Sequence, residues 1–279
     1  MNILKRNIPS RLIMRLFLGI LVVVSVYPLL WMFMASFKTN AEFTMNRFGF
    51  PRRFTFVNYI EAWKQGNFAV FFVNSGIVTA LSLFLMLGTA SMTAFSFVRY
   101  RFGISRAMLS YFIIGQMLSA QVVLIAIYLL MVILKLADSL PGLSLVYAAS
   151  GLPFTIFLMQ GFFRSLPLEL FEAAEIDGYN DWAIFVSIAL PLVAPGLATA
   201  FIIQFLYVWN EFPLALIVIS SAEKTTLPVG IYRVVNDMYY SNYARACAGL
   251  AISALPVLVI YLVFQKKIIS GITAGAIKG

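Results

Sequence analysis

Residues 165–191 read SLPLELFEAAEIDGYNDWAIFVSIALP and lie between two long apolar runs. Five of the 11 acidic residues of the chain fall within positions 169–181 of this stretch. The Ser-Leu-Pro triplet at 165–167 is suited to capping and starting a helix, good helix formers follow as far as Ile176, and Gly178 is a favoured stop residue. The pattern predicts a short, isolated helix with acidic edges.

The predicted helix has one face with small side chains and one face with large apolar side chains. Ala173 and Ala174 supply small side chains, whereas Leu168, Phe171 and Ile176 can bury in something else. Such a helix is shaped to enter a cleft on another protein. A solvated linker that merely connects two apolar segments would show the same composition, so the residues by themselves leave both interpretations open.

The segment after this helix begins with a cap and contains two prolines. Asn180 or Asp181 can accept hydrogen bonds from the first amides of the next helix. Pro191 and Pro195 interrupt that helix, and because proline lacks an amide hydrogen they are expected to bend it.

Apolar runs of membrane-spanning length make up most of the chain. It is 62% hydrophobic and 11% charged, with a mean hydropathy of +0.92, well above the ~45–50% apolar content of a soluble domain. A bilayer crossing needs about 20 apolar residues. Six runs without charge reach that length, and a seventh, at 212–222, is too short. The six lie at 16–37, 65–98, 107–134, 139–163, 182–210 and 246–265.

The distribution of basic residues predicts the orientation. Lysine and arginine gather before residue 16, in the link at 99–106 and after residue 265, and such segments lie on the cytoplasmic side. We therefore predict an all-α membrane protein with six transmembrane helices and both termini cytoplasmic, the first run being an uncleaved anchor. The expected parts are a cytoplasmic N-terminus, the first helix, an external loop with an interfacial helix near 57–64, a five-helix core and a cytoplasmic tail. They cover 1–15, 16–37, 38–66, 67–265 and 266–279.

Several kinds of chemistry are excluded by composition. The chain has no histidine, so serine-histidine catalysis and histidine-based metal sites are not possible. Cys247 is the single cysteine, and no phosphate-binding GxxxxGK[ST] loop occurs. The net charge of +9 follows the ends of apolar runs and does not form a nucleic-acid surface. We expect no catalytic residue, metal or cofactor in this chain, and nucleotide energy must come from a partner.

A candidate solute path is less sharply marked. Glu211 is a carboxylate that directly follows a membrane run, and ionisable groups at such positions are functional candidates. Trp209 and Asn210 beside it offer the aromatic face and the amide that sugar recognition uses, and Asn74 opens the second run. Glu211 at a helix end can equally reach interfacial water.

The acidic loop resembles a known signature. Glu172-Ala173-Ala174, Gly178, Ile188 and Leu190-Pro191 match, in residue and spacing, the EAA motif of binding-protein-dependent ABC importer permeases. In that family the loop, here about 165–191, forms a coupling helix that docks on the ATP-hydrolysing subunit. The resemblance implies ATPase-coupling roles for Glu172, Ala173, Ala174, Gly178, Ile188, Leu190 and Pro191. It also implies that a bulky residue at Gly178 uncouples ATP hydrolysis from transport.

Other stretches resemble carbohydrate importers. The end of the chain at 271–279 looks like the tail of the smaller permease of the maltose-importer type, and it implies that Gly275 and Lys278 contact the ATPase. Asn58-Tyr59 with Trp63, the stretch 209–212 and the stretch 226–230 are similar to the same relatives.

The resemblance implies a type I ABC importer permease in the bacterial or archaeal plasma membrane. Its partners would be a second, homologous permease, two ATPase subunits that hold ATP and magnesium, an extracytoplasmic sugar-binding protein and membrane lipid, with no nucleic acid. The implied cargo is a sugar, with an oligosaccharide favoured over glycerol-phosphate or another polar solute. An ion-coupled secondary carrier is disfavoured because the central runs lack midplane charges. A membrane enzyme is disfavoured by the absence of histidine.

Overall fold

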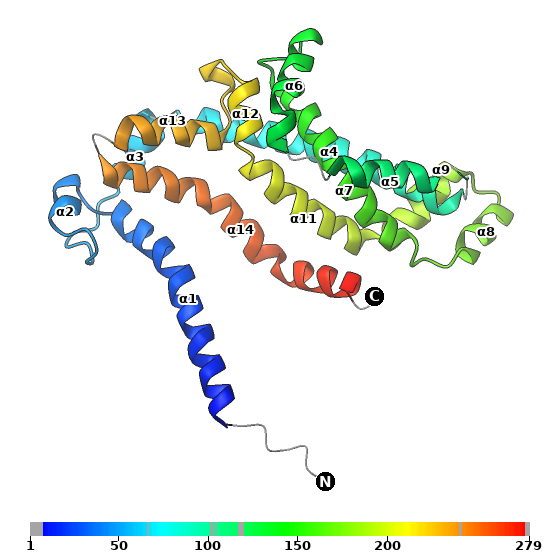
Figure 1. Ribbon diagram of the computed structural model, residues 1–279, viewed down its shortest axis with the longest axis horizontal. Coiled ribbons are helices and arrows are strands. Elements are labelled where there is room, and N and C mark those ends of the chain that lie inside the picture. Colours follow the sequence, from blue (N-terminus) through cyan, green and yellow to red (C-terminus); the bar gives the residue numbers. More distant parts are fainter. Residues whose placement is uncertain are drawn as a thin grey trace. The chain divides into compact units, whose positions relative to one another are not determined.

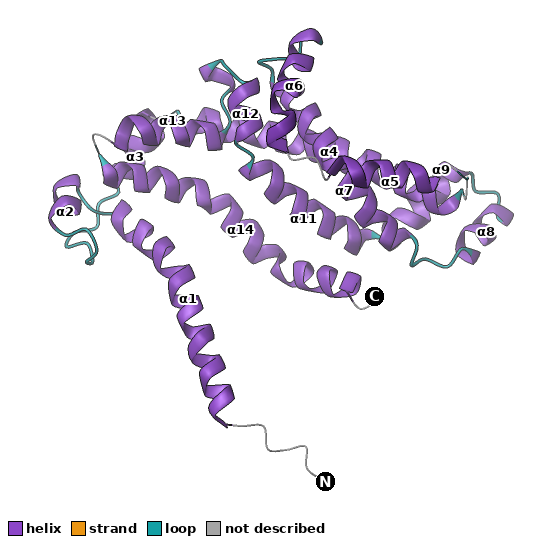
Figure 2. Ribbon diagram, viewed as in Figure 1, coloured by secondary structure: helices purple, strands orange, loops and turns teal. Residues whose placement is uncertain are grey.

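The computed structural model describes residues 8–276 except 66, 101, 102, 104, 117–119, 240 and 241. Throughout these residues the chain forms helices and connecting loops, with no strand (Figure 2), so the predicted all-α class is confirmed there. Contacts divide the chain into two compact units. One contains Met1–Phe68 with Ile231–Leu255, and the other Ala69–Gly230 with Pro256–Gly279.

The first unit joins the beginning of the chain to part of its last helix. Its helices are α1 (Ile8–Ser36), α2 (Asn40–Met45), α3 (Val57–Gln65), most of α13 (Leu227–Tyr239) and the first part of α14 (Tyr243–Ala276). Ala35, Phe43, Ala244 and Cys247 form a buried apolar cluster in this unit. From Ile13 to Leu30, α1 leaves its large apolar side chains exposed, as a helix does when lipid is its solvent.

The predicted helix near 57–64 is present as α3. Asn58 is buried at its start, and its side-chain amide donates hydrogen bonds to the carbonyl oxygens of Ser36 (2.8 Å) and Lys38 (2.6 Å). Glu61 forms an ion pair with Arg245 of α14. The segment that contains α3 is therefore folded onto the end of α1 and the start of α14.

The second unit contains the acidic loop. In Figure 1, α8 lies at one end of this unit and α6 and α12 lie toward the other, and α7 packs against α5 and α11. The elements, in chain order, are α4 (Phe68–Arg99), α5 (Ser105–Gln116), α6 (Ala120–Ile133), α7 (Leu140–Phe163), α8 (Glu169–Ile176), α9 (Asp181–Ile184), the π-helix η1 (Phe185–Ala189), α10 (Leu190–Leu192), α11 (Ala194–Asn210), α12 (Pro213–Val218), the 3₁₀ turn η2 (Ala222–Lys224), the start of α13 as far as Gly230 and the part of α14 from Pro256 onward.

Four helices of the described residues are long and apolar enough to cross a bilayer: Ile13–Ser36, Phe68–Arg99, Leu140–Phe163 and Tyr243–Phe264. A bent pair, Asp181–Leu192 with Ala194–Asn210, makes a fifth crossing when its two parts are counted as one span. The third apolar run, at 107–134, contains most of α5 and all of α6. Residues 117–119 lie outside the described residues, so the single crossing expected from this run stays a prediction.

The bend in the fifth crossing was predicted and is confirmed. Asn180 caps its first turn, accepting a hydrogen bond from the amide of Ala183 at 2.8 Å. The helix then passes through a π-helical turn and breaks at Val193 by 76°. Pro191 and Pro195 flank this break, where each removes an amide donor from the backbone ladder.

Candidate functional site

The short helix predicted between two apolar runs exists as α8. Phe171 is fully buried and Ala174 nearly so, in a cluster with Phe95, Phe163 and other apolar residues of the second unit. The opposite side carries Glu172 and Ala173, which are exposed, and Ile176, which is 87% exposed. The two alanines therefore face different ways, because only Ala174 packs inside this chain.

The start of α8 differs from the sequence expectation. Ser165 does not cap it, because its hydroxyl donates instead to the carbonyl oxygen of Phe162 at the end of α7 (2.7 Å). Leu168 occupies the N-cap position without a side-chain hydrogen bond, and the helix begins at Glu169. Ser165 thus serves the end of the preceding helix, whose last carbonyls also lack intrahelical donors.

The end of α8 follows the prediction closely. Gly178 has a φ of +85°, a left-handed conformation that glycine adopts without strain. Its amide donates to the carbonyl oxygen of Glu175 and the amide of Tyr179 donates to that of Ala174, both at 3.0 Å. This pair of hydrogen bonds is the Schellman arrangement, which turns the chain sharply from α8 toward α9.

Replacing Gly178 by valine is expected to uncouple ATP hydrolysis from transport. A Cβ at this position meets nothing within 4 Å, so the cost is backbone strain of about 1–2 kcal/mol and not a clash. Gly178→Asn is the matched control, because asparagine tolerates the left-handed region. Transport per ATP hydrolysed should fall in the valine variant and stay close to wild type in the asparagine variant. Equal values for the two would contradict the role of the turn.

An arginine of α4 holds α8 and α9 together. The Arg99 guanidinium pairs with Glu175 of α8, and its Nε lies 3.8 Å from a carboxylate oxygen of Asp181, the first residue of α9. The hydroxyl of Tyr100 also donates to Asp181, and this hydrogen bond raises the pKa of Tyr100. Sequence reasoning assigned Arg99 only to topology. Its position at the end of an apolar run gave no sign of a partner 76 residues away.

Arg99 leaves part of the acidic charge free. Glu169, Glu172 and Asp177 form no ion pair within the part of the chain that the structure describes. They are exposed together with Ala173 and Ile176. The outward surface of α8 is therefore acidic and partly apolar, which suits contact with a basic cleft on another protein.

The remaining residues of the EAA-like motif lie beyond α8. Ile188 and Leu190 are partly buried against the same cluster that holds Phe171, and Pro191 is exposed just before the helix break. Of the two tail residues, Gly275 belongs to the last part of α14. Lys278 lies outside the described residues.

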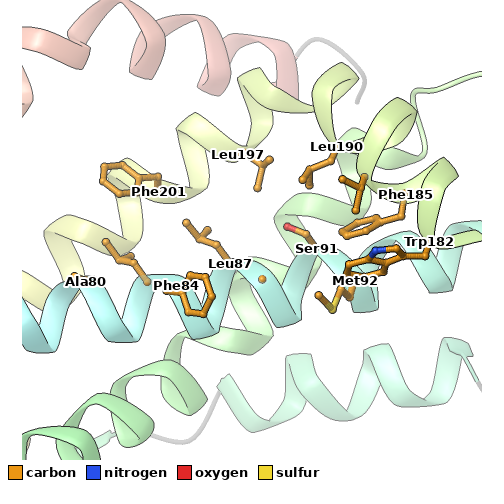
Figure 3. Close-up of a pocket in the computed structure, with 13 residues that line it drawn as sticks. Ala80, Phe84, Leu87, Ser91, Met92, Trp182, Phe185, Leu190, Leu197 and Phe201 are labelled. Atoms are coloured by element: carbon orange, nitrogen blue, oxygen red, sulfur yellow. The ribbon is translucent and has the colours of Figure 1, made fainter.

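A cavity of about 580 Å³ lies between α4 and the bent pair (Figure 3). Its lining is apolar apart from the Ser91 hydroxyl and the Trp182 ring nitrogen, and Phe84, Leu87, Leu197 and Phe201 face it in the close-up. A polar solute needs several convergent hydrogen-bonding groups. This cavity suits an apolar occupant and is a poor site for a sugar.

A second cavity, of about 350 Å³, contains two of the predicted path residues. Asn210 and Glu211 line it together with Tyr207, Leu124 and Phe212. The Glu211 carboxylate accepts hydrogen bonds from the Tyr147 hydroxyl (2.5 Å) and from two amides at the start of α12. The carboxylate therefore holds α7 and α12 together at the edge of this cavity.

The other two predicted path residues have separate surroundings. Trp209 is buried and stacks on Phe205, with ring centroids 5.4 Å apart. Asn74, also buried, donates from its side-chain amide to the carbonyl oxygens of Glu223 (2.8 Å) and Thr225 (2.9 Å). Asn74 thus fixes the 223–225 segment against α4.

Asp138 joins the loop between α6 and α7 to the η2 turn. Its carboxylate accepts from the amides of Ser220 (3.0 Å) and Ser221 (2.9 Å) and from the Ser221 hydroxyl, and it pairs with Lys224 at 3.2 Å. The hydrogen bonds from Ser221, its hydroxyl foremost, hold the pKa of Asp138 well below its ordinary range.

Asp138→Asn is expected to lower the midpoint of thermal unfolding at pH 7. A lowered pKa means that the ionised carboxylate stabilises the fold above the unfolded value of about 4. That stabilisation declines as the pH falls below the unfolded value and is lost as the pH falls through the lower folded value. Asparagine tolerates the φ of +49° at this position, so the backbone is kept. Measured at pH 7 and at decreasing pH, the difference between wild type and variant should shrink on acidification, and a constant difference would contradict this assignment.

The described residues include helices long and apolar enough to cross a membrane, and α8 exposes Glu172 and Ala173 on one side, so the fold is that expected of a membrane-embedded subunit with a partner. Residues 86–274 match the family described as "Binding-protein-dependent transport system inner membrane component". The chain belongs to this family. It is accordingly a permease subunit of an ABC transporter and a membrane component, and the prediction that it is not itself an enzyme is confirmed by that membership.

Curated relatives agree over nearly the whole length. The chain is 39% identical to a putative ABC transporter permease of a Caldicellulosiruptor species, covering 95% of this chain and 96% of the relative. It is 33% identical to a diacetylchitobiose uptake permease of Streptomyces coelicolor, covering 92% and 85%. It is 30% identical to a maltodextrin transport permease of Bacillus subtilis, covering all of both chains.

Solved structures share the fold. A chain of a bacterial ABC transporter involved in the import of the acidic polysaccharide alginate superposes with a TM-score of 0.83, at 24% identity, covering 95% of this chain and 98% of that one. A second structure, of a bacterial alginate ABC transporter in complex with an alginate pentasaccharide-bound periplasmic protein, gives a TM-score of 0.65 at 17% identity, covering 93% and 95%.

Proposed function

We propose that this permease imports a sugar, with an oligosaccharide favoured, that an extracytoplasmic binding protein delivers. The observation that carries the proposal is α8, which is anchored through Phe171 and Ala174 and presents Glu172 and Ala173 outward. The relatives named for diacetylchitobiose and maltodextrin support the choice of cargo. Glycerol-phosphate or another polar solute is the alternative cargo.

The proposed assembly contains this chain, a second homologous permease, two ATPase subunits with ATP and magnesium, and the binding protein. Within it, α8 docks on an ATPase subunit, with Glu172, Ala173, Ala174, Gly178, Ile188, Leu190 and Pro191 as coupling residues. The tail residues Gly275 and Lys278 contact the ATPase as well. The exposed carboxylates of Glu169 and Glu172, which form no ion pair among the described residues, support docking against a basic surface.

The proposed topology has six crossings with both termini in the cytoplasm of a bacterium or archaeon. It divides the chain at the boundaries 1–15, 16–37, 38–66, 67–265 and 266–279. The basic segments beside the apolar runs support this orientation. The sixth crossing would combine α5 and α6, neither of which is long enough alone.

The proposed solute path runs past Asn210 and Glu211, which line the 350 Å³ cavity. Trp209 stacks on Phe205 next to the residues that line this cavity. Asn74 contributes indirectly, by fixing the position of the 223–225 segment. The amide, the carboxylate and the Tyr207 ring are the kinds of group that bind sugar hydroxyls and sugar faces.

The proposal is tested by purifying the chain with its co-expressed partners and reconstituting the complex in liposomes. Binding protein loaded with one of a panel of sugars, or with glycerol-phosphate, is then added. ATPase activity should rise and the matching sugar should accumulate inside. Absence of a co-purifying ATPase, or uptake driven only by an ion gradient, would overturn the function, and stimulation by glycerol-phosphate alone would overturn the cargo.

A further inference from the structure

The helix α4 is attached to α8 at its last turn by two side chains. Phe95 and Arg99 stand four residues apart and so lie on one face of the helix. The ring of Phe95 packs edge-on against that of Phe171 of α8, with centroids 5.6 Å apart and planes at 83°. Arg99 pairs with Glu175, one turn further along α8. An apolar contact and an ion pair therefore fix α8 to α4 at two points.

The ionic contact is protected from solvent on the arginine side. The Arg99 side chain is 13% exposed, whereas Glu175 is 49% exposed. Asp181 adds a second carboxylate at 3.8 Å, so the same guanidinium also reaches the start of the bent crossing. A mostly buried arginine without its carboxylates would leave an unpaired charge, which is costly. Movement of α8 away from Arg99 is therefore resisted, and movement together with α4 is favoured.

The opposite end of α4 is attached to a different segment. Asn74 binds two carbonyl oxygens at 223 and 225, and the Ser75 hydroxyl oxygen accepts from the amide of Leu227 at 2.8 Å. Between these contacts and Arg99 the helix is continuous. Its 32 residues correspond to a length of about 48 Å, enough to cross a bilayer. One rigid element thus joins the loop with α8 to the segment 223–227.

We propose that Arg99 is the positioning residue through which a displacement of α8 enters α4 and reaches the 223–227 segment at the other end of the helix. This rests on the proposed docking of α8 on an ATPase. Beyond that docking, the proposal assigns the movement to α4 and its point of entry to the Arg99–Glu175 ion pair. The neighbouring Asp181 carries the same displacement into the bent crossing.

The test compares charge variants in the reconstituted complex. Arg99→Gln and Glu175→Gln each remove the ion pair, and Arg99→Glu combined with Glu175→Arg restores it in reverse. Arg164→Gln is the matched control, because Arg164 is an exposed arginine close to the same loop and forms no ion pair among the described residues. Transport per ATP hydrolysed should fall by about 5-fold or more in the single variants, the lower range of coupling between sites. It should return to at least half of wild type in the reversed pair and be unchanged in the control.

A second readout follows the far end of α4 directly. Glu223→Cys, in a Cys247→Ala background, is labelled with a membrane-impermeant maleimide with and without trapped nucleotide. The labelling rate should change with nucleotide when Arg99 is present and lose that change in Arg99→Gln. Normal transport per ATP in the single variants, or a reversed pair as uncoupled as the singles, would overturn the proposal. Failure of the wild-type complex to bind ATPase would instead overturn the proposed function.

Discussion

Replacing Ala173 with tryptophan is expected to reduce transport by more than about tenfold while the permease still folds. The side chain of Ala173 is exposed on α8 and takes no part in the buried cluster that holds the helix. A large ring at this position adds no strain within the chain, but it blocks close approach of the proposed ATPase. A steric cost above ~1.4 kcal/mol at the contact gives a tenfold loss of affinity.

The measurement is twofold: sugar uptake by reconstituted complex, and the amount of ATPase that co-purifies. Both should fall for Ala173→Trp. Ala107→Trp is the matched control, since Ala107 is also exposed, near the start of α5, and a tryptophan is well tolerated near a membrane interface. Undiminished uptake by Ala173→Trp would show that the outward surface of α8 touches no partner.

Replacing Gly142 with alanine is expected to destabilise the folded chain by about 1–3 kcal/mol, the usual cost of overpacking. A Cβ there would lie 2.2 Å from the carbonyl oxygen of Leu136 and 2.7 Å from the side chains of Met131 and Ser139. The first of these is a backbone atom and cannot move without displacing the loop that ends at Asp138.

The same helix offers an internal control. Gly161 of α7 has nothing within 4 Å of an added Cβ, so Gly161→Ala should be neutral or stabilising by about 0.5–1 kcal/mol. The two variants are compared by thermal unfolding of the purified complex, detected with a dye that reacts with the thiol of the buried Cys247 as it becomes exposed. A lower unfolding midpoint is expected for Gly142→Ala and not for Gly161→Ala. Equal midpoints would refute the close contact.

Local signals explain why the loop could be predicted from sequence. The end of α8 at Gly178, the cap at Asn180 and the bend near Pro191 each depend on a residue whose backbone chemistry permits few alternatives. The long apolar runs predicted helices because a bilayer offers no hydrogen-bond partners, so a spanning segment must satisfy its own backbone amides and carbonyls.

Contacts between distant residues could not be predicted in this way. Arg99 and Glu175 are 76 positions apart, and Asn74 lies about twice as far from the carbonyls it binds. Nothing in either segment alone specifies the pairing, which arises only when α4 packs in the folded unit. The predicted N-cap at Ser165 was wrong for a related reason. A serine between two helices can hydrogen-bond to the end of the first or to the start of the second, and Ser165 bonds to the end of the first.

The break at Val193 has a consequence for how lipid solvates this chain. Ala194–Asn210 has 17 residues, fewer than the roughly 20 that cross a bilayer alone, so the crossing is completed only by the segment before the bend. Two prolines beside the bend withhold amide hydrogens from neighbouring carbonyls. Hydrocarbon cannot supply the missing donors. The carbonyls at this break must therefore turn toward protein or water, and this part of the crossing cannot be solvated by lipid alone.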